Sequence, residues 1–370
     1  MPNTIQKLYE LGQSVWCDNI SRAMVDSGTL MRMIDGGIVG VTSNPTIFMK
    51  AITGGTDYDA LFGRLISGGA ADMEVYEGLV LPDIRDGADA LRPVYDRTGG
   101  ADGFISLEVN PKLAYRKDET VAEARRLWAT VDRPNLMIKV PATEQGLPAV
   151  EVLIGEGINV NVTLIFSIAM YRKVMQAYLN GLKKREVGGG DLSRAASVAS
   201  FFVSRLDTAV DRLLDEKTAT PELSDLKGKA AVANTKLAYA AFKEVFQGGG
   251  EFASLKGKGA RVQRPLWAST STKNPAYPDT LYVDPLIGPE TVNTMPPATI
   301  EVTLDHGVAA LTIEAGLDEA RSTFDRLRDA GIYIDAVTDK LLTDGVDLFA
   351  RSFDDLLADI AHKRERLTGV

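Results

Sequence analysis

The sequence predicts an α/β fold in which eight parallel strands close into a single-domain (β/α)8 TIM barrel with extra helices. Two observations favour this fold: short β-type runs alternate with longer helical stretches, and 370 residues are enough for eight such units with insertions. Alternating strands and helices imply right-handed crossovers and a parallel sheet. An open doubly wound sheet is the alternative. That fold usually carries a glycine-rich phosphate-binding turn, and neither GxGxxG nor GxxxxGK followed by Ser or Thr occurs.

The predicted strands are short apolar runs that end in polar residues or proline. The clearest is LMIKVP, which opens after Pro134 and closes at Pro141. The last of the eight is the weakest, because only Val292 and Met295 in it are apolar. The predicted strands are residues 14–19, 38–43, 104–109, 136–141, 159–164, 197–202, 265–270 and 291–295.

Helical patterns fill the intervals between these runs. The predicted helices are residues 21–35, 112–130, 167–185, 206–216, 228–246 and 317–329, and we expect further helices within 45–103. Near the end, Phe349, Phe353, Leu356, Leu357 and Ile360 recur at helical spacing, with charged residues opposite them. This pattern predicts a C-terminal amphipathic helix packed on the barrel. Glycine clusters occur at 188–190 and 248–250. No shift in composition accompanies them, so they are interpreted as loops and not as domain linkers, and we expect one domain over residues 1–370.

Composition narrows the possible partners. The net charge is −9 and the basic residues are dispersed, which argues against a nucleic-acid surface. One cysteine, Cys17, and two histidines without ligand spacing argue against a structural zinc site, although a magnesium site built from carboxylates alone stays open.

The sequence shows neither a secretory signal nor a membrane-spanning apolar run, so we expect a cytoplasmic protein.

Lys139 lies inside the fourth predicted strand rather than at its edge. Because side chains in a strand alternate faces, Met137, Lys139 and Pro141 share one face, and helices on the other face would turn the lysine into the barrel. A partly desolvated amine loses its proton more readily and can attack a carbonyl carbon. The alternative is a lysine whose stem covers apolar surface while its ammonium group reaches water.

Polar residues recur at alternate positions near the ends of several strands. Barrel strands are covered outside by helices, so these side chains should point inward, at the end where active sites of this fold are built. They are Trp16, Asp18, Thr42, Asn44, Ser106, Glu108, Lys139, Asn159, Asn161, Thr163, Ser269 and Ser271. Each alone could be a capping or water-bonded group. Two carboxyl groups and an amine that come from three strands instead indicate one reactive site, because buried charges need partners of opposite charge.

That set of groups suits Schiff-base chemistry. Lys139 would add to a ketose carbonyl, and the protonated imine would accept electrons when the neighbouring carbon–carbon bond breaks. Proton transfers accompany both steps, and Asp18 and Glu108 are the candidates for them. Thr163 could orient a water molecule.

Five motifs resemble the transaldolase family in its longer bacterial branch. They are WCDN at 16–19, VTSNPTIF at 41–48, ISLEV at 105–109, LMIKVPAT at 136–143 and GINVNVTLIFS at 157–167. The resemblance extends to ASTSTKNP at 268–275 and implies a barrel enzyme with a class I mechanism and no metal or cofactor. It implies transfer of dihydroxyacetone from sedoheptulose 7-phosphate to glyceraldehyde 3-phosphate, giving erythrose 4-phosphate and fructose 6-phosphate in the pentose phosphate pathway. The family includes monomers and homodimers.

The resemblance also implies roles for individual residues. Lys139 resembles the Schiff-base lysine, Asp18 the acid/base at the bond being cleaved, and Glu108 and Thr163 the pair that works through a catalytic water. The substrate-binding groups implied are Thr42, Asn44 and Asn161 for the dihydroxyacetone unit, and Ser200, Arg205 and Ser269 for the phosphate. Where the shorter branch places a second arginine, this chain offers Ser271 and Lys273.

Two other functions remain open at this point. A related class I sugar-phosphate aldolase would use the same lysine without the transfer step. A non-catalytic sugar-phosphate-binding barrel is the other alternative, and Asp18, Glu108 and Lys139 together argue against it.

Overall fold

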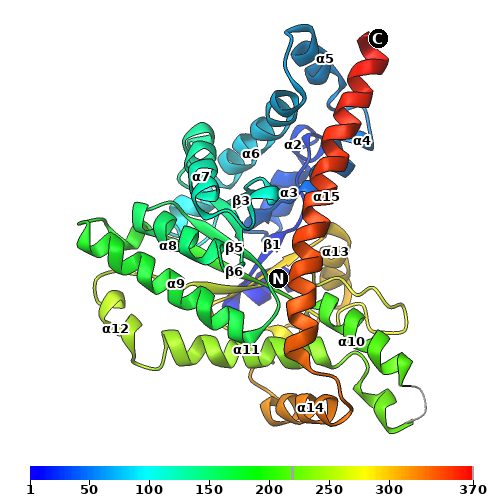
Figure 1. The fold of residues 1–370 in the computed structure, drawn as a ribbon. Helices are drawn as coiled ribbons and strands as arrows, with labels where there is room; N and C mark the ends of the chain where they lie inside the picture. The colour runs from blue at the N-terminus through cyan, green and yellow to red at the C-terminus, as the bar shows by residue number, and fades with distance from the viewer. Residues whose placement is uncertain (218–220, 369–370) are drawn as a thin grey trace.

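The computed structural model describes residues 1–217 and 221–368, and its centre is a closed barrel of eight parallel strands (Figure 1). Strands adjacent in the chain pair with each other, and the first pairs with the last. The predicted (β/α)8 barrel is therefore confirmed. The strands are β1 (Gln13–Cys17), β2 (Gly40–Thr42), β3 (Phe104–Glu108), β4 (Leu136–Pro141), β5 (Val160–Ile165), β6 (Ser197–Phe202), β7 (Arg264–Ala268) and β8 (Thr291–Met295).

Helices surround the barrel and fill the long connection after β2. Before β3 they are α1 (Thr4–Glu10), α2 (Arg22–Asp26), α3 (Thr29–Asp35), α4 (Pro45–Thr53), α5 (Asp59–Ser67) and α6 (Asp72–Arg97). Between β3 and β7 they are α7 (Lys117–Val131), α8 (Gly146–Glu156), α9 (Ile168–Val187), α10 (Ser204–Glu216), α11 (Ala230–Phe246) and α12 (Glu251–Lys256). After β8 follow α13 (Pro297–His306), α14 (Leu317–Asp329) and α15 (Ile334–Thr368). Short 3-10 turns occupy η1 (Pro111–Leu113), η2 (Leu192–Arg194), η3 (Pro221–Leu226) and η4 (Asp284–Leu286).

Two helix predictions were wrong in their details. Residues 21–35 form two helices, because Gly28 adopts a left-handed conformation (φ 71°) that interrupts the helical backbone between α2 and α3. The helix predicted from residue 112 begins at Lys117, after the 3-10 turn η1. In addition, α8 was not predicted.

The strands separate two apolar layers. Outward side chains such as Val15, Val41 and Ile138 belong to the core between strands and helices. Inside the barrel, Trp16 packs in the same cluster as Phe104. A Cβ atom at Gly40 would lie 2.5 Å from the Trp16 ring, so the indole takes the space that a β2 side chain would fill. The barrel interior is thus packed at this level, and cavities open at its two mouths.

The C-terminal helix α15 runs along one side of the molecule and contacts α4, α6 and α10 (Figure 1). Its apolar face is buried through Phe349, Phe353, Leu356 and Ile360. The prediction of an amphipathic terminal helix on the barrel is confirmed. None of the helices described carries an apolar stretch that could cross a membrane.

Candidate active site

Lys139 lies inside the barrel, near the carboxyl end of β4, and only 5% of it is exposed. Its Nζ donates a hydrogen bond to the backbone oxygen of Ser43 at 2.9 Å. The β3–β4 register places Glu108 directly opposite Lys139, and Glu108 Oε2 lies 3.3 Å from the amine. The predicted inward direction of this lysine is therefore confirmed.

Asp18 follows the end of β1 and is the second carboxyl group near this amine. Burial raises the pKa of Asp18, while the charge of Lys139 and a hydrogen bond from Thr42 oppose that rise. Burial likewise raises the pKa of Glu108, against the charge of Lys139. Both acids can therefore carry a proton closer to neutral pH than a free carboxyl, which suits general acid–base work.

Two threonines fix the orientation of Asp18. Thr42 Oγ1 donates to Asp18 Oδ1 at 2.7 Å, and the same hydroxyl lies 2.7 Å from Thr294 Oγ1. The chain of bonds links the ends of three strands, β1, β2 and β8. Asp18 is thus held by its neighbours before any substrate binds. Sequence reasoning missed Thr294, although it lies two residues after Val292 and so on the same face of the weakest predicted strand.

A cavity of about 840 Å³ opens from Lys139 to the surface at this mouth of the barrel. Most of the sequence-predicted site residues line it: Asp18, Thr42, Asn44, Lys139, Thr163, Ser200, Arg205, Ser269 and Lys273. Glu108 and Asn161 do not line it, and lie behind its wall. Glu108 still reaches the site through its ion pair with Lys139.

Thr163 is placed by an irregularity in β5. The pairing register between β5 and β6 shifts between Val162 and Ile165, and Leu164 takes a positive φ of 60°. Thr163 Oγ1 is buried without a hydrogen-bond partner among the described residues. A buried hydroxyl in this state needs a partner. The adjoining cavity can supply one as a substrate atom or a water molecule.

Asn161 connects the strands beneath the cavity. Its Nδ2 donates to Ser106 Oγ at 3.0 Å, and its Oδ1 accepts from Ser200 Oγ at 2.7 Å. The side chain thereby bridges β3 and β6 from β5. Ser200 thus donates its hydroxyl proton to Asn161 in this structure and also lines the cavity.

The β2–α4 junction brings backbone and side-chain groups to the amine. Asn44 caps α4, with its Oδ1 accepting from Ile47 N at 3.0 Å, and Pro45 begins the helix. Asparagine is a favoured cap and proline a favoured first residue, so the SNP sequence predicts this turn. The cap uses the side-chain oxygen of Asn44, and the residue lines the cavity.

Arg205 lies in the first turn of α10 and belongs to the cavity wall. Its guanidinium carbon lies 5.2 Å from the centre of the Phe202 ring and 5.9 Å from that of Phe349. Burial lowers the pKa of Arg205, and the charge of Asp18 opposes this. Two aromatic faces therefore hold a cation at the mouth of the site.

Helix α10 is anchored by a buried carboxyl group two residues after Arg205. Asp207 accepts hydrogen bonds from Ala231 N at 2.8 Å and from Tyr282 Oη at 2.9 Å. Burial raises the pKa of Asp207 to about 7. These bonds connect α10 to α11 and to the β7–β8 connection, which fixes the position of Arg205.

The segment after β7 combines backbone strain with exposure. Ser269 has a positive φ of 57°, a conformation that costs energy and is often found at functional sites. Its Oγ lies 2.9 Å from Ser204 Oγ. Lys273 is exposed, and its Nζ donates to Ser271 Oγ at 2.6 Å.

Sequence reasoning missed two further residues in this cavity, Lys50 and Phe349. Lys50 is an exposed residue of α4 and adds a cation to the wall. Phe349 was recognised only as part of the apolar face of the terminal helix. Its contact with Arg205 depends on how α15 crosses α10, which no local pattern encodes.

Comparison with known proteins gives consistent results over almost the whole chain. Residues 15–360 match a family described as Transaldolase/Fructose-6-phosphate aldolase. A transaldolase from Thermobifida fusca is 50% identical over 365 residues, covering 98% of this chain and 99% of that protein. One from Trichodesmium erythraeum is 46% identical over 378 residues, covering 100% and 99%. A protein named Transaldolase 2 from Streptomyces coelicolor is 48% identical over 369 residues, covering 99% of each.

Proposed function

This chain belongs to the transaldolase family and is a transferase with transaldolase activity, and we propose that it transfers its substrate fragment through a Schiff base on Lys139. The observation that carries this proposal is the position of the amine. It lies inside a closed barrel, paired with Glu108 at 3.3 Å and acting electrostatically on Asp18. A charged lysine is costly to bury unless it is paired and hydrogen-bonded, and here Glu108 and the Ser43 backbone oxygen supply these partners.

The proposed reaction moves a dihydroxyacetone unit from sedoheptulose 7-phosphate to glyceraldehyde 3-phosphate. The Lys139 amine adds to the ketose carbonyl, and loss of water gives a protonated imine. A base then removes the proton from the hydroxyl group on the far carbon of the neighbouring carbon–carbon bond, and that bond breaks. Its electron pair moves into the imine to form an enamine. The enamine attacks the acceptor aldehyde and hydrolysis frees fructose 6-phosphate, while erythrose 4-phosphate is the first product.

The geometry supports a division of the proton transfers. We assign to Asp18 the hydroxyl proton at the bond being cleaved, because its carboxylate faces the cavity and is oriented by Thr42. We assign to Glu108 and Thr163 the water that is lost and regained at the imine. Glu108 forms an ion pair with the Lys139 amine although it does not line the cavity, and the Thr163 hydroxyl has no protein partner among the described residues.

Binding roles follow from position in the same cavity. Thr42, Asn44 and Asn161 are proposed to hold the dihydroxyacetone unit. Asn161 does not line the cavity and would act through Ser200, which does and whose hydroxyl donates to it. Arg205, Ser200 and Ser269 are proposed for the phosphate. An arginine offers a planar fork that matches phosphate oxygens. The flanking rings of Phe202 and Phe349 keep that fork in place.

Lys273→Ala is expected to raise KM for phosphorylated sugars about threefold while largely sparing kcat, because an exposed lysine contributes about 0.2–1 kcal/mol to an ionic contact. Steady-state kinetics with fructose 6-phosphate and erythrose 4-phosphate measure this. Lys340→Ala, an exposed lysine on α15 that does not line the cavity, is the matched control. An unchanged KM for Lys273→Ala would remove Lys273 from the phosphate site.

The Schiff base itself is tested by reduction. Borohydride treatment in the presence of fructose 6-phosphate should add one reduced dihydroxyacetone or sugar unit to the peptide that contains Lys139, as read by mass spectrometry. Lys184, an exposed lysine on α9, serves as an internal control and should stay unmodified. Absence of an adduct at Lys139 would defeat the mechanism.

We further propose that the chain works as one domain in the cytoplasm, on free sugar phosphates, as a monomer or a homodimer. The packing of α15 against α4, α6 and α10 supports the single domain, since the terminal helix completes the cavity wall through Phe349. The single buried Cys17 is compatible with a reducing compartment.

A further inference from the structure

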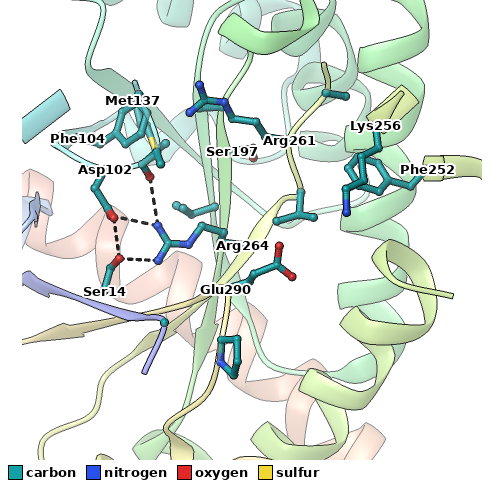
Figure 2. A pocket seen from close by; sticks show the side chains of 18 of the residues that line it. Ser14, Asp102, Phe104, Met137, Ser197, Phe252, Lys256, Arg261, Arg264 and Glu290 are labelled. Carbon is teal, nitrogen blue, oxygen red and sulfur yellow. Dashed lines mark hydrogen bonds and ion pairs between the residues drawn. The ribbon is translucent and has the colours of Figure 1, made fainter. Parts of the chain in front are cut away.

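A second cavity, of about 580 Å³, lies at the opposite mouth of the barrel, where the strands begin (Figure 2). Its volume falls within the range of about 300–1,000 Å³ that is usual for small-molecule sites. Residues at or beside the starts of β1, β3, β4, β6, β7 and β8 line it, including Ser14, Phe104, Met137, Ser197 and Arg264. The proposed reaction does not use this space.

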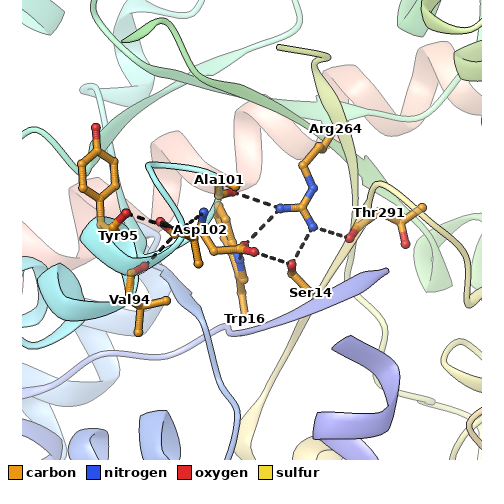
Figure 3. A network of polar contacts seen from close by, with 9 residues as sticks. Ser14, Trp16, Val94, Tyr95, Ala101, Asp102, Arg264 and Thr291 are labelled. Atoms are coloured by element: carbon orange, nitrogen blue, oxygen red, sulfur yellow. Dashed lines mark hydrogen bonds and ion pairs between the residues drawn. The ribbon is translucent and has the colours of Figure 1, made fainter. Parts of the chain in front are cut away.

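A polar network closes the floor of this cavity toward the barrel interior (Figure 3). Asp102 Oδ2 accepts from Ser14 Oγ at 2.8 Å, and Oδ1 accepts from Trp16 Nε1 and Arg264 Nη1, each at 3.1 Å. Arg264 Nη2 donates to Ser14 Oγ at 2.6 Å and to Thr291 O at 2.7 Å. Because Trp16 also fills the barrel above this network, a ligand in the lower cavity would not reach Lys139.

Two cations beside this floor lack a carboxylate partner. Arg264 is neutralised by Asp102, but neither Lys256 nor Arg261 forms an ion pair in the part of the chain that the structure describes. Arg261 donates one hydrogen bond to the backbone oxygen of Gly99. Glu290 is the other carboxylate of the wall, and Gln247 donates to it at 2.8 Å. Three cations and two carboxylates thus leave one net positive charge around the cavity.

Apolar side chains supply the rest of the wall. Phe252 of α12 is buried beside Lys256, and Met137, Val198 and Phe104 belong to the apolar cluster inside the barrel. Figure 2 shows Phe252 and Lys256 together on one side of the cavity and Arg264 with Asp102 on another. The cavity therefore combines a surface that favours a ring with a charge that favours an anion.

We propose that this cavity binds a small organic monoanion with an apolar, ring-sized body, that is, an aromatic carboxylate. The single excess positive charge matches one carboxylate, whereas a phosphate monoester carries about −1.5 to −2 at neutral pH and would stay partly uncompensated. The carboxylate contacts Lys256, and the ring lies against Phe252 and the apolar side chains of Phe104, Met137 and Val198. Arg261, whose guanidinium group points away from Lys256 in Figure 2, contributes its charge without a direct contact. The site is independent of the Schiff-base mechanism.

The probe for this proposal is naphthalene-2-carboxylate, and the measurement is isothermal titration calorimetry on the full chain in the presence of saturating fructose 6-phosphate. We expect saturable binding of one molecule per chain. The neutral isostere naphthalene-2-carboxamide should bind about tenfold more weakly, since it loses the ionic contacts. Persistence of binding with sugar phosphate present places the ligand outside the Lys139 cavity.

Variants locate the anion. Lys256→Gln should weaken naphthalene-2-carboxylate binding about fivefold or more while leaving the carboxamide unaffected. Arg261→Gln, which removes a charge but no direct contact, should weaken it about twofold. Glutamine is shorter than arginine and gives up the bond from Arg261 Nη2 to the Gly99 backbone oxygen, so thermal unfolding of Arg261→Gln beside the parent chain checks that the fold is kept. Arg125→Gln, an exposed cation on α7 away from the cavity, is the control and should bind like the parent. Absent binding, displacement by fructose 6-phosphate, or an affinity of Lys256→Gln equal to that of the parent chain would each overturn the proposal.

Discussion

Lys139→Met should reduce turnover by about 10⁴-fold or more, a barrier increase of about 5 kcal/mol, because the proposed mechanism forms its covalent intermediate on this amine. Among the residues that line the cavity, Lys50 and Lys273 are the other lysines, and both are exposed. Neither has the enclosed position beside two acids that makes Lys139 suited to the reaction. Initial rates with fructose 6-phosphate and erythrose 4-phosphate measure the loss.

The same variant should keep its fold. Methionine fills the space of the lysine stem, and the backbone oxygen of Ser43 loses one donor. Glu108 and Asp18 lose the charge that lowers their pKa against burial, so both are expected to take up protons and remain neutral inside the barrel. Circular dichroism and thermal unfolding beside the parent chain check this. A folded Lys139→Met enzyme within about tenfold of parent activity, a change of about 1.4 kcal/mol, would contradict the Schiff-base assignment.

The barrel could be predicted because its strands are covered on both faces. Such strands are continuous apolar runs with few polar interruptions, and β4 and β6 have the predicted boundaries. β8 also has the predicted boundaries, although only Val292 and Met295 in it are apolar. The polar interruptions fall on the inner face, so period-two alternation alone places Lys139 and Trp16 inside. Asp18, Thr42 and Asn44 follow from the same count, because the strand ends of a closed barrel meet at one mouth.

What sequence reasoning missed depends on contacts between distant segments or on irregular backbone. The shift in β5 at Leu164 changes which neighbours Thr163 faces, and a bulge of this kind has no sequence signature here. Glu108 and Asn161 point inward as predicted, but they lie behind the cavity wall because the register with β4 and β6 sets their depth. Phe349 reaches Arg205 across more than one hundred residues of chain.

Asp18→Asn separates bond cleavage from formation of the imine. The asparagine oxygen can still accept the hydrogen bond from Thr42, so the side chain should keep its orientation, but it cannot remove a proton. We expect turnover to fall by about 10³-fold, within the range of about 10²–10⁴ for loss of a general base. Imine formation should survive, because Glu108 and Thr163 are left unchanged beside Lys139.

The informative measurement is therefore made on the trapped intermediate. Borohydride added to Asp18→Asn with fructose 6-phosphate should yield an adduct on Lys139 with the mass of the whole sugar phosphate, whereas the parent enzyme should also give the dihydroxyacetone adduct left after cleavage. Glu108→Gln is the matched control: it removes the other buried acid, and should slow appearance of every adduct without changing their ratio. If Asp18→Asn instead gave the dihydroxyacetone adduct as fast as the parent, the cleavage proton would have to pass to a different group, and the orienting bonds from Thr42 and Thr294 would serve the fold alone.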